Sequence, residues 1–462
     1  MTQLPVTIGG ARVGVLGLGR SGYAVARLLA ARGASVYASD RGASAAVLAN
    51  AAALRERGIS AETGGHDVAR LAACDWIVVS PGIPPDAPIL GEPGVVARPI
   101  FSELEVASWF TRVPIAAITG TNGKTTTTAL LGAISQGAGI RTSVAGNIGR
   151  AFSTAVLEDV DVEWFVLEVS SFQLARIVTF RPRVAVVLNL APDHLDTYPT
   201  LAAYAADKAR IAENLHAGDQ LCLSAEDAAL AGLGADSPAE RYWFHRDAAV
   251  ARGASVEAEW IALRGTPAAG RVLPVNRLRI PGHHNLQNAL AATLAASLMG
   301  IDTAAIAEGL ASFPGIAHRL ETIAVVGGVT WINDSKATNV AAAAVALETC
   351  RAPLVVILGG RHKEAPYAPL APALASHARE VLAIGEAATR IAAELGGAAP
   401  VTVVETLERA VERADEIARP GDVVLLSPAC SSYDQFASFE ERGDRFRALV
   451  ADLAAHRQDG AA

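Results

Sequence analysis

The sequence predicts an α/β fold of three domains, each built around a largely parallel sheet. Three observations support this prediction. The chain has 462 residues, and 51% of them are hydrophobic. That length is about three ordinary domains. Short apolar runs alternate with stretches of helical periodicity along most of the chain. Many of these runs end at a glycine-rich or polar segment, the place where parallel strands present ligand-binding loops.

The first domain is expected over residues 1–111, with a Rossmann-like βαβ order. An apolar strand over 12–16 leads into Gly17-x-Gly19-x-x-Gly22 and then a helix. A second strand ends at Asp40, and a third covers 76–79. Glycines let the backbone approach a diphosphate, and the helix N-terminus supplies positive potential. The motif leaves NAD, another nucleotide diphosphate and a purely structural turn open.

The second domain is expected over residues 112–314 and carries a stronger phosphate signal. A buried strand over 115–118 precedes Thr119-Gly120-Thr121-Asn122-Gly123-Lys124-Thr125-Thr126 and a helix to about residue 136. Backbone N–H groups of such a loop wrap phosphate oxygens, Lys124 would reach the terminal phosphates, and the Thr125 hydroxyl would coordinate Mg²⁺. Ile118 stands where the strict pattern has its first glycine. We expect ATP binding here, and the alternative is a chance glycine turn.

Two further strands of this domain, over 164–167 and 184–188, end at polar residues. Glu168 follows the first and is well placed for Mg²⁺, although a strand-end glutamate can also be an ordinary surface residue. His194 follows the second and is either a metal or substrate contact or a solvated loop histidine. Residues 220–280 are expected to form a smaller sheet. Asn285 and Asn288 then share one helix face, where they would contact adenine or, for Asn285, cap the helix.

The third domain, over residues 315–462, is expected to be doubly wound. Strands are indicated over 329–332, 354–358, 381–384 and 423–426, with helical spacers between them. Polar loops follow three of these strands, over 333–339, 359–363 and 427–436. Because the carboxyl ends of parallel strands share one edge, three such loops predict a pocket for a small acid.

Lysine usage singles out particular positions. The chain has only four lysines against 35 arginines: Lys124, Lys208, Lys336 and Lys363. Lysine offers a compact charge and an amine that can lose its proton, which arginine does not. We therefore expect these lysines to have functions that arginine cannot replace, rather than to be solvated surface charges.

Composition excludes several classes of protein. The net charge of −8 and the lack of a basic run argue against nucleic-acid binding. The four cysteines are far apart, which disfavours a zinc site or a disulfide framework and favours a reducing compartment. No signal peptide or membrane-spanning run is recognised, so a cytoplasmic enzyme without membrane insertion is expected.

Taken together, these motifs resemble the Mur ligase superfamily, ATP-dependent enzymes that build the peptidoglycan stem peptide. The resemblance covers nearly the whole chain. It rests on the phosphate loop, Glu168 to Leu174, Asp193-His194-Leu195-Asp196, His284-Asn285-x-x-Asn288, His318-Arg319 and Asn333 to Asn339. The segment 427–436, with Phe439, Arg442 and Gly443, resembles the branch that adds D-glutamate. The Asp-Asn-Pro-Arg motif of the diaminopimelate-adding relatives is absent.

The resemblance implies an amide ligase that joins D-glutamate to UDP-N-acetylmuramoyl-L-alanine through an acyl phosphate, using ATP and Mg²⁺, as a monomer. Under this resemblance, the N-terminal glycine motif would bind the uridine diphosphate of the substrate rather than NAD. The implied substrate contacts are Gly19, Arg20, Ser21, Asp40, Arg41, Asn147 and His194. The implied ATP contacts are Gly120 to Thr126, Asn285, Asn288, Arg319 and Asp334. The implied D-glutamate contacts are Lys336, Thr338, Lys363, Ser432 and Phe439.

Lys208 falls where the family carries an N-carboxylated lysine, whose carbamate would lie beside Mg²⁺ with Thr125, Glu168 and His194. Lys124, Lys208, Glu168 and His194 are thus the implied catalytic residues. The chain departs from the family at Ala191, Thr197, Arg361 and His362, which affects fine substrate contacts rather than the reaction class. Two rivals remain. One is a sibling ligase, including a folate polyglutamate ligase, and the other is a nicotinamide-dependent oxidoreductase.

Overall fold

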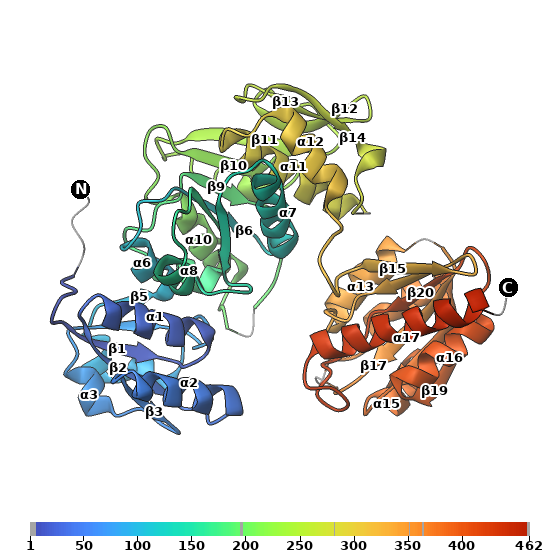
Figure 1. Cartoon of the computed structure of the whole chain (residues 1–462), viewed down its shortest axis with the longest axis horizontal. Helices are drawn as coiled ribbons and strands as arrows, with labels where there is room; N and C mark the ends of the chain where they lie inside the picture. Colours follow the sequence, from blue (N-terminus) through green and yellow to red (C-terminus); the bar gives the residue numbers. More distant parts are fainter. Residues whose placement is uncertain (1–5, 195–196, 281, 351, 363–364, 460–462) are drawn as a thin grey trace. The chain divides into compact units, whose positions relative to one another are not determined.

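The computed structural model describes residues 6–194, 197–280, 282–350, 352–362 and 365–459 (Figure 1). It divides into two compact units, Met1–Phe313 and Pro314–Ala462. The first unit holds two sheets and the second holds one. The three domain ranges given above stay a prediction. Over the described residues, no helix combines the length and apolar character needed to cross a membrane.

The first sheet is parallel and has helices on both faces, as the βαβ pattern predicts. Its strand order is β3-β2-β1-β4-β5. The strands are β1 (Arg12–Leu16), β2 (Ser35–Asp40), β3 (Ser60–Thr63), β4 (Trp76–Val79) and β5 (Ile100–Ser102). Residues of α1 (Arg20–Ala31), α2 (Ala45–Glu56) and α6 (Glu103–Ser108) join one core, and residues of α3 (Val68–Ala72), α4 (Pro88–Gly91) and α5 (Pro93–Val96) join the other. Alternate strand residues enter the two cores, the two-residue period of a strand.

The second sheet has nine strands in the order β14-β13-β12-β11-β10-β9-β6-β8-β7. They are β6 (Ile115–Thr119), β7 (Thr142–Gly146), β8 (Trp164–Glu168), β9 (Val184–Val187), β10 (Gln220–Ser224), β11 (Glu240–His245), β12 (Gly253–Glu257), β13 (Trp260–Arg264) and β14 (Gly270–Pro274). The helices α7 (Lys124–Gly137), α11 (His283–Leu298) and α12 (Thr303–Ser312) pack together, as Figure 1 shows. The other helices of this region are α8 (Phe152–Glu158), α9 (Ser171–Leu174) and α10 (Leu201–Ala209).

The expectation of a separate small sheet over 220–280 was wrong. β10 pairs in parallel with β9, β11 and β12 continue the parallel order, and β13 and β14 add an antiparallel edge. An isolated sheet of short strands is marginally stable, whereas the open edge of β9 offers backbone N–H and C=O groups to pair with. The strands therefore extend the existing sheet.

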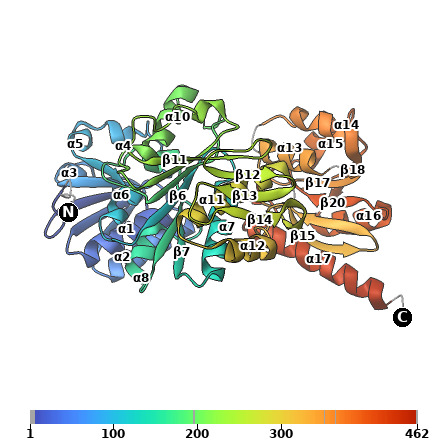
Figure 2. The same ribbon diagram turned by 90° about the horizontal axis from the view of Figure 1, so that it is seen from above.

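The second unit is a doubly wound domain, as predicted. Its sheet has the order β15-β16-β20-β17-β18-β19, and only the β15–β16 pair is antiparallel. The strands are β15 (Glu321–Val326), β16 (Val329–Asn333), β17 (Leu354–Gly359), β18 (Ala378–Ile384), β19 (Val401–Glu405) and β20 (Val423–Leu426). The helices α13 (Val340–Thr349), α14 (Ala371–His377) and α15 (Ala388–Leu395) contribute to one core, and α16 (Leu407–Ile417) and α17 (Phe439–Asp459) to the other. Figure 2 shows α14 and α15 on one side of the strands and α17 on the other.

Candidate active site

The phosphate loop links β6 to α7 and requires glycine at two positions. Gly120 has φ 145° and Gly123 has φ 85°, both in the region that side chains disfavour. A Cβ atom at Gly123 would lie 2.1 Å from Oδ1 of Asn288, and one at Gly120 would lie 2.9 Å from Cβ of Leu188. The loop thus packs closely against its neighbours and leads into the N-terminus of α7, the type of position where helices bind phosphate.

The segment after β9 holds the phosphate loop in place through hydrogen bonds. The backbone N–H of Asn122 donates to Oδ1 of Asn189 at 2.8 Å, and the Asn189 amide donates back to the Asn122 carbonyl at 3.1 Å. The Thr121 hydroxyl accepts the backbone N–H of Ala191 at 3.0 Å. Ala191 is one of the departures from the family pattern, yet its contribution here is a main-chain bond that any residue except proline can make. The departure therefore leaves the loop intact.

Lys124 and Lys208 meet at the loop backbone. Nζ of Lys124 donates to the carbonyls of Gly120 and Thr121, each at 2.9 Å, and Nζ of Lys208 donates to the same Gly120 carbonyl at 2.8 Å. Lys208 is 1% exposed. Burial lowers the pKa of Lys208 most, the charge of Lys124 lowers it further, and the resulting pKa is about 7. Near neutral pH a large share of Lys208 is therefore the neutral amine.

Glu168 ends β8 and provides a buried carboxylate next to this pair. Its side chain is 2% exposed, Oε1 accepts the Asn147 amide at 3.2 Å, and Oε2 has no hydrogen-bond partner among the described residues. Its negative charge acts on Lys208. A buried carboxylate oxygen without a partner is costly unless something else binds it.

These groups fit a magnesium ion. Over the described residues, no three His, Cys, Asp or Glu side chains gather closely enough to hold a metal by themselves. Mg²⁺ usually needs only one or two protein carboxylates, because substrate phosphates and water complete its shell. The bare Oε2 of Glu168 and the Thr125 hydroxyl in the first turn of α7 are donors of the right type.

His194 is about half exposed, unlike the buried Glu168 and Lys208. It has φ 54°, and its side chain is 48% exposed. Its ring lies 5.1 Å from that of Phe172 and 6.3 Å from that of Tyr204, while Nζ of Lys208 lies 4.6 Å above the Tyr204 ring. The predicted catalytic histidine and lysine thus share one aromatic neighbour. Asp196, in the same motif, falls outside the described residues.

Asn285 and Asn288 lie at the start of α11, against the phosphate loop. Both are buried, and the Asn288 amide donates to Oδ1 of Asn285 at 3.2 Å. The alternative that Asn285 caps the helix is wrong, since Gly282 is the N-cap residue and has a φ of 98° that favours glycine. The amide pair remains a prediction as the adenine contact.

The N-terminal glycine motif packs closely at Gly22 and is open at Gly19. A Cβ atom at Gly22 would lie 1.7 Å from the Gly17 carbonyl, whereas nothing described lies within 4 Å of one at Gly19. Asp40 accepts the N–H groups of Leu18 and Gly42, both at 2.7 Å. The exposed Arg20 donates to the Gly149 carbonyl at 2.6 Å, which places it beside the loop that carries Asn147. Ser21 is partly exposed and Arg41 is exposed.

In the second unit, Asp334 follows β16 and is nearly buried. Its carboxylate accepts the Ser427 hydroxyl at 2.8 Å and the Leu320 N–H at 3.1 Å. Burial raises the pKa of Asp334 to about 7, although these bonds and the charge of Arg319 act in the opposite direction. The predicted ATP residues Arg319 and Asp334 are therefore neighbours.

Arg442 joins the three polar loops of the second unit. It is 1% exposed and donates to the Ser335 hydroxyl at 3.0 Å and to the carbonyls of Ser335, Gly359 and Cys430 at 2.9, 3.4 and 3.2 Å. Burial lowers the pKa of Arg442 to about 10. From the sequence, Arg442 was named only as part of the segment that resembles the D-glutamate-adding branch, and no structural role was predicted for it. Its position confirms that these loops lie together.

Lys336 and Phe439, two predicted D-glutamate contacts, lie side by side. Nζ of Lys336 is 5.8 Å from the centre of the Phe439 ring, and the Ser335 hydroxyl donates to the Phe439 carbonyl at 2.8 Å. Ser432 is buried and Thr338 is partly exposed. Lys363 falls outside the described residues.

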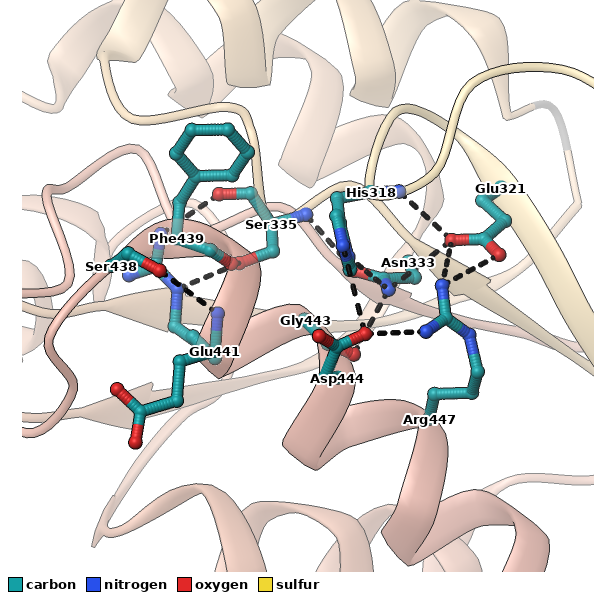
Figure 3. Close-up of polar contacts among 11 residues, drawn as sticks. His318, Glu321, Asn333, Ser335, Ser438, Phe439, Glu441, Gly443, Asp444 and Arg447 are labelled. Atoms are coloured by element: carbon teal, nitrogen blue, oxygen red, sulfur yellow. Dashed lines mark hydrogen bonds and ion pairs between the residues drawn. The ribbon is translucent and has the colours of Figure 1, made fainter. Parts of the chain in front are cut away.

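A polar network behind Phe439 ties the His318 loop to the first turns of α17 (Figure 3). The Asn333 amide donates to the Gly443 carbonyl at 3.1 Å and lies 3.1 Å from Nδ1 of His318. Arg447 donates to both oxygens of Glu321, at 2.9 and 3.0 Å. Sequence reasoning missed Glu321 and Arg447, because they are 126 residues apart and carry no motif.

Comparison with known proteins places this chain in one family. Family models match over three ranges: the Mur ligase MurD-like N-terminal domain over 11–94, the Mur ligase middle domain over 118–296 and the Mur ligase glutamate ligase domain over 318–430. A protein of Acidobacterium capsulatum named UDP-N-acetylmuramoylalanine–D-glutamate ligase is 43% identical, over 97% of both chains. One of the same name from Anaeromyxobacter dehalogenans is 46% identical, over 96% of this chain and 98% of its own.

A solved structure supports the fold independently. The UDP-N-acetylmuramate-alanine ligase MurC of Thermotoga maritima superposes with a TM-score of 0.59 at 21% identity, covering 96% of this chain and all of its own. With three family models along its length and relatives more than 40% identical over nearly all of it, this chain belongs to the Mur ligase family.

Proposed function

We propose that this chain is the ATP-dependent ligase that joins D-glutamate to UDP-N-acetylmuramoyl-L-alanine in peptidoglycan precursor synthesis. The observation that carries this proposal is full-length identity of 43% and 46% to two proteins named for that reaction. The local geometry agrees with it, because the phosphate loop, the buried Glu168 and Lys208 lie together in the first unit, and Arg442 joins three polar loops in the second.

The proposed chemistry begins with the free carboxylate of the L-alanine part. One of its oxygens attacks the γ-phosphorus of ATP, the bond to the ADP oxygen breaks, and an acyl phosphate forms. The amine of D-glutamate then attacks the acyl carbon, and the bond from this carbon to the phosphate oxygen breaks. Phosphate leaves, and the nitrogen loses one proton as the amide forms. The products are an amide, ADP and phosphate.

In this proposal the chain acts mainly by positioning and by charge neutralisation. The N–H groups of the phosphate loop and Lys124 hold the transferred phosphoryl group, and Asn285 and Asn288 contact adenine. Arg319 contacts phosphate, and Asp334 contacts the ribose. The uridine diphosphate and sugar-peptide are held by the residues around Gly19 and Asn147 that were named from the sequence.

Glu168, Thr125 and a modified Lys208, with His194 beside them, would hold Mg²⁺. When bound, the ion would neutralise charge on the phosphoryl oxygens. The modification is N-carboxylation of Lys208, in which the neutral amine attacks CO₂ and loses a proton, so that a carbamate anion replaces the ammonium group. The lowered pKa of Lys208 supports it, since only the neutral amine is a nucleophile.

D-Glutamate would bind in the second unit, framed by Lys336, Thr338, Ser432 and Phe439, with Lys363 from the segment outside the described residues. Closure of this unit on the first would bring ATP and amino acid together. We also propose a cytoplasmic monomer. The four free, buried cysteines agree with a reducing compartment.

The test is phosphate release from ATP in the presence of UDP-N-acetylmuramoyl-L-alanine, with D-glutamate, L-glutamate, L-alanine and diaminopimelate supplied separately. Release with D-glutamate alone is the expected result. Release with another amino acid would assign a sibling activity. Release with none, together with NADH binding detected by fluorescence, would favour the oxidoreductase instead.

A further inference from the structure

A cavity of about 740 Å³ lies in the first unit, away from every residue placed in the active site above. Its wall includes Arg112, Arg181, Arg183 and His216, with Trp109 and Asn214. The volume is within the usual range for small-molecule sites. No step of the proposed reaction uses any of these residues.

The cavity is at the opposite edge of the central sheet from the phosphate loop. Ile115, the first residue of β6, lines it, whereas the phosphate loop follows the last residue of β6, Thr119. Arg183 directly precedes β9, whose far end leads to Asn189 and the phosphate-loop contacts. Because parallel strands present all their carboxyl ends on one edge, this cavity is a separate site.

The charge of the wall is one-sided. Three arginines and a histidine line the cavity, and among its described lining residues there is no aspartate or glutamate. Asp219 pairs with Arg181 and Arg183 at 3.2 Å from each, but its side chain is fully buried behind them. Arg112 is exposed, and among the described residues it forms no ion pair within 4.0 Å. Three arginines, counted against the buried carboxylates of Asp219 and of Glu105 on α6, leave the cavity an excess of about one positive charge.

The wall is held rigidly by a buried carboxylate on α6. Glu105 is 0% exposed and accepts the backbone N–H groups of Val178, Thr179 and Phe180 at 2.8–3.0 Å. It also accepts Nε1 of Trp109 at 2.8 Å. Two lining segments are thus fixed to each other before any ligand binds, which reduces the entropy lost on binding.

We propose that this cavity, lined by Arg112, Arg181, Arg183 and His216, binds a small phosphate-bearing anion. Guanidinium groups from separate segments can surround a tetrahedral phosphate and donate to several of its oxygens, while a single carboxylate has only two oxygens in one plane. Arg112 lies on the connection between α6 and β6 and Arg181 and Arg183 precede β9, so the ligand ties this connection to the central sheet.

The test uses pyrophosphate, with citrate as a carboxylate of similar charge, and isothermal titration calorimetry on the full chain. The active site is first saturated with a non-hydrolysable ATP analogue, Mg²⁺ and UDP-N-acetylmuramoyl-L-alanine. Pyrophosphate is expected to bind more tightly than citrate, and its affinity is expected to fall with added salt. Arg112→Gln is expected to weaken pyrophosphate binding about tenfold, since a charge-assisted hydrogen bond is lost. Basal ligase activity is expected to stay unchanged.

The matched control is Arg277→Gln. Arg277 is also exposed, but it follows β14, at the edge of the sheet separated from β9 by four strands. This control is expected to bind pyrophosphate as the unmodified chain does. Arg181→Gln is a second cavity variant, in which Arg183 still pairs with Asp219. The proposal is wrong if the saturated chain binds no pyrophosphate at millimolar concentration, if citrate binds as tightly, or if Arg112→Gln and Arg277→Gln behave alike.

Discussion

Lys124 and Lys208 donate to one common acceptor, the main-chain carbonyl of Gly120, at 2.9 and 2.8 Å. Two ammonium groups at one carbonyl oxygen repel each other, and the repulsion is relieved when Lys208 gives up its proton. The phosphate loop thus places Lys208 where loss of its proton relieves this repulsion, and the neutral amine is the form that can act as a nucleophile.

Replacement of Lys208 by alanine is expected to abolish ligase turnover, because the carbamate that would lie beside Mg²⁺ is lost. Acetate is expected to restore part of the rate by supplying a carboxylate in the space left empty. The measurement is phosphate release with and without acetate. Lys208→Arg is the control, since its side chain fills the space and cannot be carboxylated. Turnover near the unmodified rate in Lys208→Ala would rule out the carbamate role.

The stability of the first unit is expected to depend on Lys208 in a defined pH window. The pKa of Lys208 is about 7 in the folded chain, against 10.5 for an ordinary solvated lysine, so between these values the unfolded chain binds the extra proton. The free energy of unfolding therefore rises with pH from 7 to 10.5 as far as Lys208 determines it. Below pH 7, Lys208 is charged in the folded chain as well, and burial of this charge destabilises the fold by its full amount. A shift of this size corresponds to on the order of 5 kcal/mol.

Lys208→Met removes this titration while it retains most of the side-chain volume. The variant is expected to be more stable than the unmodified chain at pH 7, by an amount that shrinks toward pH 10. Urea unfolding in CO₂-free buffer at several pH values measures the difference. A difference that does not change with pH would contradict the assigned pKa.

Asp334→Asn is expected to stabilise the second unit while it weakens ATP binding. The pKa of Asp334 is raised from 3.8 to about 7, so between these values the folded chain holds a proton that the unfolded chain has lost. The free energy of unfolding therefore falls as pH rises from 3.8 to 7, as far as Asp334 determines it. Above pH 7, Asp334 is ionised in the folded chain as well, and its buried charge destabilises the fold by its full amount. The asparagine variant should gain up to roughly 4 kcal/mol above pH 7 and nothing near pH 3.

Urea unfolding at pH 3.5, 5.5 and 7.5, with the ATP Kd at pH 7.5, checks both effects. Ser427→Ala serves as a control, because it removes a hydrogen bond to the same carboxylate but leaves the titration. An equal effect of Asp334→Asn at all three pH values would show that ionisation is not the cause.

Gly443→Ala is expected to destabilise the second unit even though it lies inside α17. Helix propensity alone favours alanine by about 1 kcal/mol. A Cβ atom at Gly443, however, would lie 2.1 Å from Nδ1 of His318, a contact that forces His318 to move. Overpacking of this kind costs about 1–3 kcal/mol.

The measurement is a double-mutant cycle with His318→Ala. If the clash is the cause, Gly443→Ala should cost nothing, or stabilise, in the His318→Ala background. The KM for D-glutamate should rise in Gly443→Ala, because Phe439 begins the same helix. An unchanged cost in both backgrounds would exclude the clash.

The strands and helices of this fold were largely predictable, because buried parallel strands are continuous apolar runs. The strand at Ile115 and the helix after the phosphate loop begin within one residue of the prediction. The continuation of the central sheet through β10 was not predictable, since the sequence of β10 does not reveal that its partner is β9. Pairing at a sheet edge depends on which edge is left open.

The site was predictable where a residue type is rare or a motif is local. Lys208 was recognised because lysine is scarce in this chain. Glu105 was missed although it is fully buried, since its acceptor role depends on N–H groups more than 70 residues away. A single glutamate on a helix gives no indication of distant partners. Which residues contact each ligand stays a prediction.

The scarcity of lysine has a practical consequence for chemical labelling. A succinimidyl ester or an aldehyde-coated surface has only four lysine side chains to modify, and all four, Lys124, Lys208, Lys336 and Lys363, belong to the predicted chemistry. Lys208 is 1% exposed and would react last. The cysteines are buried, so thiol coupling also lacks an accessible target. Immobilisation or dye labelling that preserves activity therefore requires an introduced cysteine on an outer face. Amine coupling serves another purpose, because slower lysine modification in the presence of substrates would show which lysines the substrates cover.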